Sequence, residues 1–326
     1  MSVVSVPDAT AEFCAATQPH RRELLVHCYQ MLGSVHDAQD LVQETMARAW
    51  RAYGRFDPGL ASMRTWLYRI ATNACLSALE TRARRPLPSG VGQPFDDPEA
   101  PFVPGLEVPW LQPFPDQVLG ARPADPESVA VERSRLRLAL VAALQLLSAK
   151  QRAALILREV LGYSAAEVAE MLETSVPAVN SALQRARAGL DQAGVSADDL
   201  EEPEAARQRV VEQYLAAFER ADVEGLVRML ADEVVLEMPP MWNWYRGPSA
   251  YGRFMVRVFA LRGTDWRVLP VAANGQPAMA AYASDGGHHV LHTLQVFTVG
   301  HGAIVRTTVF QDPSVFSLFG LRATLD

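Results

Sequence analysis

Residues 162–190, GYSAAEVAEMLETSVPAVNSALQRARAGL, constrain the fold most strongly, because two helix-start signals stand there on either side of a short turn. Ser164 and Glu167 have the spacing of a capping box, in which each side chain bonds to the backbone of the other. Ser175 can cap a second helix, and Pro177 suits its first turn. The pattern predicts a helix-turn-helix. An ordinary helical hairpin with a polar solvent face is the alternative for this segment taken alone.

The outward face of the second predicted helix carries side chains that can bond base edges and phosphates. These candidate DNA-binding residues are Asn180, Ser181, Gln184, Arg185 and Arg187. Apolar residues recur at helical spacing on the opposite face, as in Val179 and Leu183. The helix would therefore pack by one face and present the other to DNA.

Length and composition fit a folded protein of two to three domains, with 326 residues and 49% hydrophobic content. No apolar run approaches the roughly 18 residues of a membrane span, and the N-terminus has neither a basic start nor an apolar core. We therefore expect a cytoplasmic protein without a membrane partner. The three cysteines are far apart and form no CxxC pair, so we expect no disulfide framework, no metal and no cofactor.

The net charge of −7 is unusual for a DNA-binding protein, but it is unevenly distributed. Residues 1–85 hold 10 basic and 8 acidic side chains, and residues 127–195 hold 8 and 7, so the acidic excess lies elsewhere. Such a weak positive balance predicts poor independent affinity for duplex DNA, because phosphate neutralisation supplies most non-specific binding. A larger partner is therefore expected to assist DNA binding.

The chain divides into four segments by periodicity and composition. Residues 8–85 and 127–195 have helical periodicity throughout and predict two all-α modules. The segment between them, 86–126, holds 11 of the 22 prolines and predicts a linker, whose apolar middle should dock onto a folded surface. In residues 204–326 two helical patterns precede alternating strand patterns. They predict an α+β domain with a curved antiparallel sheet wrapped around the helices.

The first module contains an acidic helix face within HDAQDLVQETMARAW. Asp37, Asp40 and Glu44 recur at spacings of three and four, which places them on one side of a helix. Such a stripe suits a basic groove on a partner, and the alternative is a solvated helix face.

The next helical segment, RTWLYRIATNACLSAL, has a polar face and a basic end. Arg64, Arg69 and Asn73 lie on that face, and the arginine cluster Arg82, Arg84 and Arg85 follows it. Aromatic, amide and guanidinium groups together suit the capture of an unpaired nucleic-acid strand. Trp66 is predicted to lie in the core instead.

These two motifs, followed after the linker by LSAKQRAALILREVLGYSAAEVAEMLETSVPAVNSALQRAR, resemble an extracytoplasmic-function (group 4) sigma factor of bacterial RNA polymerase. The resemblance covers about residues 10–190. It implies that the first module is sigma domain 2, which binds the polymerase clamp and melts the −10 promoter element. It also implies that the second is sigma domain 4, which reads the −35 element and contacts the polymerase flap. The implied partners are thus core RNA polymerase and promoter DNA.

Roles for individual residues follow from this resemblance. The residues that match the clamp-binding helix are Asp37, Asp40, Leu41, Gln43 and Glu44. Phe56, Arg69 and Asn73 match positions that hold a flipped −10 base, and the helix-turn-helix residues match the −35 readers. Relatives often carry basic residues at the positions of Asn180 and Ala182. We therefore expect Gln184 and Arg185 to carry most of the −35 recognition here.

The C-terminal segment resembles the SnoaL-like members of the NTF2-like superfamily, which are α+β cones with an internal pocket. The resemblance rests on RVVEQYLAAFERADVEGLVRML, WYRGPSAYGRFM and TVFQDPSVFSLFGL. Candidate pocket residues are Tyr214, Trp242, Trp244, Tyr245, His292 and Arg306. The implied partner is a small-molecule ligand or a regulatory protein, and in sigma factors such a tail is thought to replace a separate anti-sigma protein.

Some SnoaL-like proteins are cyclases or isomerases that use Asp and His as acid and base. Here Asp285 precedes two glycines, as in a hairpin turn, and the neighbouring His288 and His289 would point to opposite faces of a strand. We therefore expect a sigma factor whose C-terminal domain modulates it in cis, and not an enzyme. The alternative is a SnoaL-like ligand-binding protein or enzyme fused to a DNA-binding repressor module.

Overall fold

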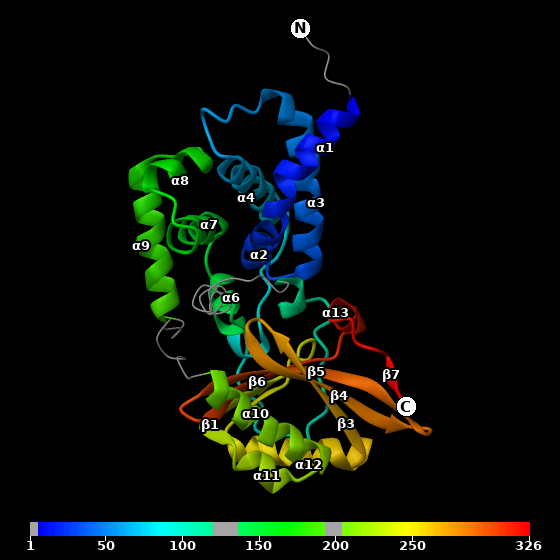
Figure 1. The fold of residues 1–326 in the computed structure, drawn as a ribbon. Helices are drawn as coiled ribbons and strands as arrows, with labels where there is room; N and C mark the ends of the chain where they lie inside the picture. The colour runs from blue at the N-terminus through cyan, green and yellow to red at the C-terminus, as the bar shows by residue number, and fades with distance from the viewer. Residues whose placement is uncertain (1–5, 120–135, 193–203) are drawn as a thin grey trace. The chain divides into compact units, whose positions relative to one another are not determined.

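The computed structural model describes residues 6–119, 136–192 and 204–326 (Figure 1). These fall into two compact units, one from residues 1–85 and 139–195, the other from residues 86–138 and 196–326. The first is helical and the second is α+β, so the predicted fold class is confirmed. The predicted boundaries at 126/127 and 195 lie outside the described residues. None of the described helices combines the length and the apolar character needed to cross a membrane.

The first helical module is built from four helices: α1 (Val6–Thr17), α2 (Arg21–Leu32), α3 (Val35–Ala52) and α4 (Met63–Thr81). Gly33 ends α2 in a left-handed conformation with φ of 69°, which glycine adopts without steric strain. Ser34 and Ser62 cap α3 and α4, each accepting a bond from the backbone three residues on. Fully buried apolar residues, among them Leu24 and Leu67, form the core.

His27 on α2 is buried against α4, where its Nε2 lies 3.0 Å from the Thr72 hydroxyl. Burial lowers the pKa of His27 from 6.5 to about 3. The folded state therefore keeps this imidazole neutral, whereas the unfolded chain protonates it below pH 6.5. Stability should fall between pH 6.5 and pH 3, by about 2 kcal/mol at pH 5.

This pH dependence can be measured by urea unfolding at pH 7 and pH 5. We expect His27→Gln to reduce the difference in unfolding free energy between the two pH values. The matched control is His288→Gln, since His288 is exposed. An equal pH difference in wild type and His27→Gln would contradict the assignment to His27.

The second helical module comprises α6 (Leu138–Leu144), α7 (Ala149–Leu155), a π turn (Ile156–Val160), α8 (Ala165–Met171) and α9 (Val176–Gln192). The predicted capping box is present. Ser164 Oγ accepts from the Glu167 amide at 3.2 Å, and Glu167 Oε2 accepts from the Ser164 amide at 2.7 Å. Val179 and Leu183 are buried on the inner face of α9, so the predicted helix-turn-helix is confirmed.

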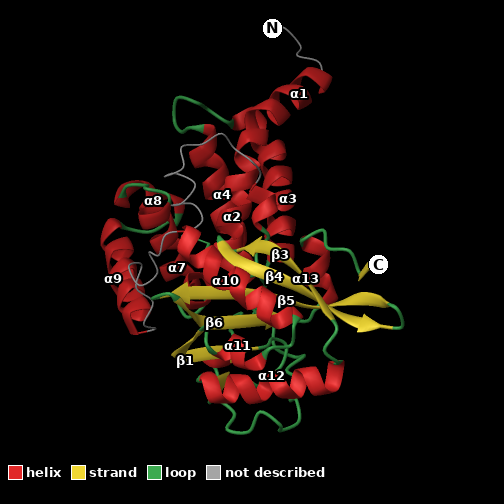
Figure 2. Cartoon of the chain, turned by 60° about the horizontal axis from the view of Figure 1, so that its bottom comes forward, coloured by secondary structure: helices red, strands yellow, loops and turns green. Residues whose placement is uncertain are grey.

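The C-terminal domain is a curved sheet with helices on one face (Figures 1 and 2). Its strand order is β2-β1-β6-β5-β4-β3, and β7 pairs with β5. The strands are β1 (Leu230–Glu237), β2 (Trp244–Arg246), β3 (Trp266–Ala273), β4 (Gln276–Asp285), β5 (His288–Gly300), β6 (Ala303–Phe310) and β7 (Thr324–Leu325). The sheet was predicted to be antiparallel, but β1 and β6 pair in parallel, because β1 joins the sheet beside a strand distant in sequence.

Helices α10 (Glu204–Glu219), α11 (Val223–Val227) and α12 (Pro248–Arg262) cover one face of this sheet, and α13 (Pro313–Leu318) follows β6. The space between helices and sheet is filled by aromatic side chains. Phe218 contacts both Phe259 and Trp266 edge to face, with ring centroids 5.4 Å and 5.3 Å apart. Aromatic side chains of the core therefore fill most of the interior of the cone.

The linker from residue 86 to 119 docks on the C-terminal domain, as its apolar middle predicts. Trp110 and Phe114 are buried, and the ring of Trp110 meets Trp242 at a centroid distance of 5.0 Å. Asn274 fixes the linker at Phe114 by two hydrogen bonds of 2.8 Å. The Asn274 backbone amide donates to the Phe114 carbonyl, and the Phe114 amide donates to Asn274 Oδ1. Burial of these side chains removes apolar surface from water, which stabilises the docked linker.

Candidate functional site

The predicted polymerase-binding residues lie along α3, but they differ in exposure. Asp40, Gln43 and Glu44 are exposed, and Glu44 forms an ion pair of 2.5 Å with Arg48 on the next turn. Leu41 is only 5% exposed and packs into the core of the first module. The face that can meet a partner is therefore polar and acidic, and Leu41 supports it from within.

Asp37, at the start of the same helix, is engaged inside the module. Its carboxylate binds Arg82 at 2.8 Å and Arg85 at 2.7 Å, the ends of the predicted basic cluster. Arg84 between them is exposed. Two of the three arginines in this cluster are thus held against α3 by Asp37.

The loop before α4 forms a cavity of about 420 Å³ together with α8. Trp66 and Arg69 line it from α4, and Glu170 lines it from α8. Phe56 packs against Trp66 with ring centroids 4.9 Å apart, and Asn73 is half-buried on the same helix. The prediction that Trp66 lies in the core was wrong, because the loop leaves the indole half-buried at the wall of this cavity.

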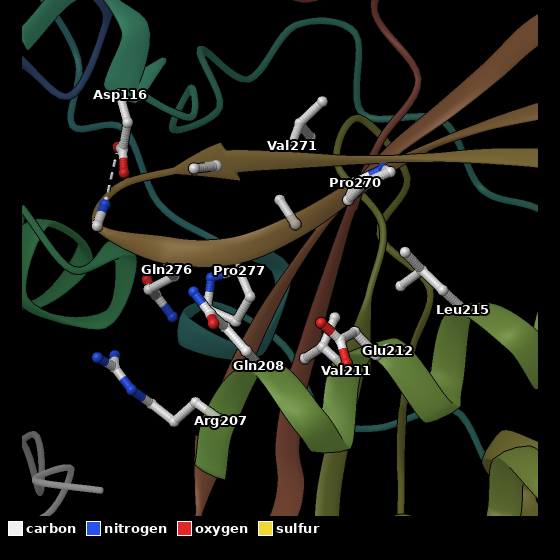
Figure 3. A pocket seen from close by; sticks show the side chains of 13 residues that line it. Asp116, Arg207, Gln208, Val211, Glu212, Leu215, Pro270, Val271, Gln276 and Pro277 are labelled. Carbon is white, nitrogen blue, oxygen red and sulfur yellow. Dashed lines mark hydrogen bonds between the residues drawn. The ribbon is translucent and has the colours of Figure 1, made fainter. Parts of the chain in front are cut away.

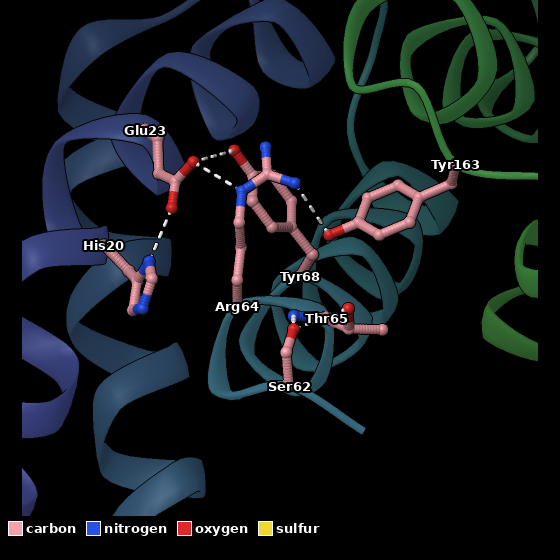
Figure 4. Close-up of polar contacts among 7 residues, drawn as sticks. All are labelled: His20, Glu23, Ser62, Arg64, Thr65, Tyr68 and Tyr163. Carbon is pink, nitrogen blue, oxygen red and sulfur yellow. Dashed lines mark hydrogen bonds and ion pairs between the residues drawn. The ribbon is translucent and has the colours of Figure 1, made fainter. Parts of the chain in front are cut away.

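Arg64 on α4 joins the two helical modules (Figure 4). Its Nε donates to Glu23 at 2.9 Å, and its Nη1 donates to the Tyr163 hydroxyl of the second module at 3.3 Å. The guanidinium also lies 4.8 Å from the centre of the Tyr68 ring, within the range of cation–π attraction. Burial raises the pKa of Tyr68 well above its ordinary value. Sequence reasoning missed Tyr163, since nothing in its local pattern marks it as a contact of α4.

Arg69 makes a second contact of this kind. It lies 3.4 Å from Glu170 at the end of α8 and 3.9 Å from Glu173 in the turn of the helix-turn-helix. All three side chains are well exposed, so each pair is weak by itself. Two residues predicted to bind the −10 strand, Arg64 and Arg69, therefore contact the second module. We call the arrangement in which Arg64 and Arg69 contact the second module the closed arrangement.

A further contact between the two modules comes from Arg152 on α7, whose side chain is buried. Its guanidinium donates to Gln145 Oε1 at 2.7 Å, to the carbonyls of Gln145 and Leu147 at 3.2 Å and 3.1 Å, and to the Met31 carbonyl near the end of α2. Burial lowers the pKa of Arg152 to about 10, so it stays charged at neutral pH. The sequence pattern of the helix did not indicate that Arg152 would be buried against α2.

The predicted recognition helix, α9, presents most of its candidate residues to solvent. Asn180, Gln184, Arg185 and Arg187 are exposed, and Arg185 donates to Ser181 at 2.6 Å. Ala182, by contrast, is only 9% exposed and packs inward. Ala182 therefore lies on the packed face of α9, whereas Asn180 lies on the exposed face.

The residues predicted to line a pocket in the C-terminal domain do not gather around one cavity. Tyr214 and Tyr245 are fully buried, and the Tyr214 hydroxyl bonds to that of Tyr251 at 2.6 Å. His292 lines a cavity of about 40 Å³ in the cone, near the size of one water molecule. Burial lowers the pKa of His292 to about 4.

The other three predicted pocket residues hold the linker. Trp242 packs on Trp110, and Trp244 donates from its indole to the Gly92 carbonyl at 3.2 Å. Arg306 pairs with the fully buried Glu237 at 2.7 Å and also donates to Ser89 Oγ at 2.9 Å. No cluster of metal-ligating residues occurs within the described part of the chain.

Comparison with family models supports the same division of the chain. Sigma-70 region 2 matches residues 17–85, Sigma-70 region 4 matches residues 137–190, and the SnoaL-like domain matches residues 211–307. The first two matches contain α2 to α4 and the helix-turn-helix. The third contains most of the curved sheet.

Individual relatives match most of the length of this chain. The chain is 47% identical over 319 residues to the ECF RNA polymerase sigma factor SigG of Mycobacterium tuberculosis, across 96% of this chain and 85% of SigG. It is 29% identical over 248 residues to SigJ of the same organism, across 75% of this chain and 67% of SigJ. The crystal structure of SigJ superimposes with a TM-score of 0.64 at 23% identity, covering 96% of this chain and all of SigJ. The chain therefore belongs to the extracytoplasmic-function family of RNA polymerase sigma factors, in the form that carries a C-terminal SnoaL-like domain.

Proposed function

We propose that this sigma factor binds the polymerase clamp through the exposed face of α3 and reads promoter DNA through two surfaces. The −10 surface is formed by the loop before α4 together with Arg64, Arg69 and Asn73, and the −35 surface is the outer face of α9. The observation that carries the proposal is the exposure of Asp40, Gln43 and Glu44 on a helix whose opposite face is packed. An exposed acidic stripe on a rigid helix suits a basic protein surface.

A gel-shift experiment with and without core polymerase tests this function. Because the helical modules carry little net positive charge, the purified chain should bind duplex promoter DNA poorly alone and stably with core polymerase. Promoters can be obtained by mapping transcription start sites after induced expression. Stable operator binding without polymerase would favour a repressor and contradict the proposal.

The closed arrangement bears on when this sigma factor acts. In it Arg69 pairs with Glu170 and Glu173 of the second module, and Arg64 donates to Tyr163 of the same module, so these contacts compete with DNA phosphates. We therefore propose that the second module leaves α4 before the −10 strand binds. The polymerase, by binding the two modules separately, would supply the free energy for opening.

Replacing Glu170 by arginine should favour opening, because attraction to Arg69 becomes repulsion at an exposed site. We expect about threefold faster promoter opening with core polymerase, since exposed pairs contribute about 0.2–1 kcal/mol. The matched control is Asp191→Arg, the same charge change at an exposed position of α9. Equal rates for Glu170→Arg and Asp191→Arg would show that the Arg69 contact does not restrain opening.

We further propose that the C-terminal domain acts in cis through the linker. The buried Glu237 carboxylate accepts bonds from the Ser89 amide at 3.2 Å, the Ser89 hydroxyl at 2.6 Å and Arg306 at 2.7 Å. Thr308 donates to the same carboxylate at 3.2 Å. This cluster fixes the linker at its start, whereas Asn274 fixes it at Phe114. A linker held at two points limits where the modules on either side of it can reach.

Replacing Glu237 by glutamine should release the start of the linker. The change removes charge-assisted hydrogen bonds and leaves Arg306 without its ion pair, so docking should weaken by about 2 kcal/mol. Amide hydrogen exchange at residues 87–92 should become faster, whereas the control Glu233→Gln, at an exposed position of β1, should leave it unchanged. Unchanged exchange in Glu237→Gln would exclude the carboxylate as the anchor.

A further inference from the structure

The C-terminal unit has a second cavity, which lies outside the interior of the cone. It measures about 430 Å³ and lies between α10 and the hairpin formed by β3 and β4 (Figure 3). Its apolar walls come from Val211, Leu215, Pro270, Val271, Pro277 and Ala278. This volume is in the range of small-molecule sites, about 300–1,000 Å³, whereas the cavity inside the cone is about 40 Å³.

The polar groups of this groove are nearly all engaged within the protein. The Gln276 side chain accepts from the Leu138 amide at 2.8 Å and donates to Phe297 and Thr298 at 3.1 Å and 2.9 Å. Asp116 accepts from the Gly275 amide at 2.9 Å. Glu212, the other carboxylate of the lining, is exposed to solvent. These groups therefore leave few hydrogen-bonding positions for a ligand.

Arg207 is the exception. Its side chain extends from the first turn of α10 towards Gln276, and its Nε atom is buried without a hydrogen-bond partner among the described residues. A buried donor without an acceptor is unfavourable, and a charged one more so. The groove thus combines apolar walls with one guanidinium whose buried Nε has no hydrogen-bond partner among the described residues.

We propose that this groove binds a small amphipathic anion, with a carboxylate on Arg207 and an apolar body along the two prolines and Val211. A guanidinium can donate hydrogen bonds to both oxygens of a carboxylate. Such a ligand would give Arg207 Nε an acceptor and would neutralise the charge of the guanidinium. The occupied groove would contact Asp116 of the linker and Gln276, which holds the residue at the start of α6. The site stands independently of the proposed opening of the helical modules.

The test is calorimetric titration of the full-length protein with octanoate and, as the neutral equivalent, octanamide. We expect octanoate to bind about tenfold more tightly than octanamide, from the charge-assisted bonds to Arg207. Arg207→Gln should abolish this preference. The control Arg209→Gln, at an exposed position of the same helix, should retain it.

A second variant tests the position of the apolar body. Ala272→Trp should fill the groove and abolish binding of both compounds, because Ala272 lines the wall and is exposed. The proposal is overturned if wild type binds neither compound, binds both equally, or keeps its preference in Arg207→Gln. Retained octanoate binding in Ala272→Trp, with an unchanged unfolding temperature, would likewise place the compound elsewhere. Since no polymerase is present, these outcomes are separate from sigma activity.

Discussion

Reversing the charges of Asp40 and Glu44 together, as Asp40→Arg with Glu44→Arg, is expected to weaken binding to core polymerase by at least about 100-fold. Both side chains are exposed on α3, so each new cation would face the basic polymerase surface that we propose as the partner of this stripe. Like charges brought together at an interface are disfavoured by several kcal/mol, and 100-fold corresponds to about 2.7 kcal/mol. Promoter-dependent transcription should fall in parallel.

The fold should survive this double change. Placing arginine at position 44 beside Arg48 replaces an attractive helix pair by a repulsive one, which costs only about 0.4–1 kcal/mol. Asp37 keeps its bonds to Arg82 and Arg85, so the end of α4 remains attached to α3. Affinity for core polymerase can be measured by competition with the wild-type chain.

A matched control is Glu80→Arg, an exposed charge reversal on α4 of the same module. It should bind core polymerase with an affinity close to that of the wild type. If the double variant also does so, the stripe on α3 is a solvated helix face. Impaired binding by Glu80→Arg to the same extent would instead indicate a general effect of charge.

Local signals in the sequence predicted the helix starts well. The capping box at Ser164 depends on atoms only three residues apart, and its bonds of 2.7 Å and 3.2 Å occur as expected. The same holds for Val179 and Leu183, whose burial follows from helical spacing. Short-range patterns of this kind are set by backbone geometry and need no knowledge of the remaining chain.

The contacts that join distant segments could not be predicted in this way. Trp66 was assigned to the core from its place among apolar residues, but the neighbouring loop decides how far it is covered. Trp242 and Trp244 were expected around a ligand, yet they bind the linker, because the docked linker takes the surface beside them. Arg152 contacts a carbonyl 121 residues away, a separation that no periodicity records.

Replacing Arg152 by alanine should produce the largest loss of stability, about 4 kcal/mol in the unfolding free energy of the helical unit. The change leaves the carbonyls of Met31, Gln145 and Leu147 without their donor and removes a buried side chain from the centre of the unit. Breaking a buried charged network typically costs about 3–5 kcal/mol. Urea unfolding followed by far-UV circular dichroism would measure the loss, with the exposed Lys150→Ala as control.

The variant Arg152→Lys distinguishes the contribution of the positive charge to stability from that of the guanidinium geometry. Its ammonium retains the charge but cannot reproduce the planar fork that reaches four acceptors from two nitrogens, so Arg152→Lys should recover only part of the lost stability. Because one acceptor is the Met31 carbonyl of α2, amide exchange at the end of α2 should also become faster in Arg152→Ala. If exchange there stays as slow as in the wild type while α7 is destabilised, Arg152 stabilises the second module alone. The closed arrangement would then depend on Arg64 and Arg69.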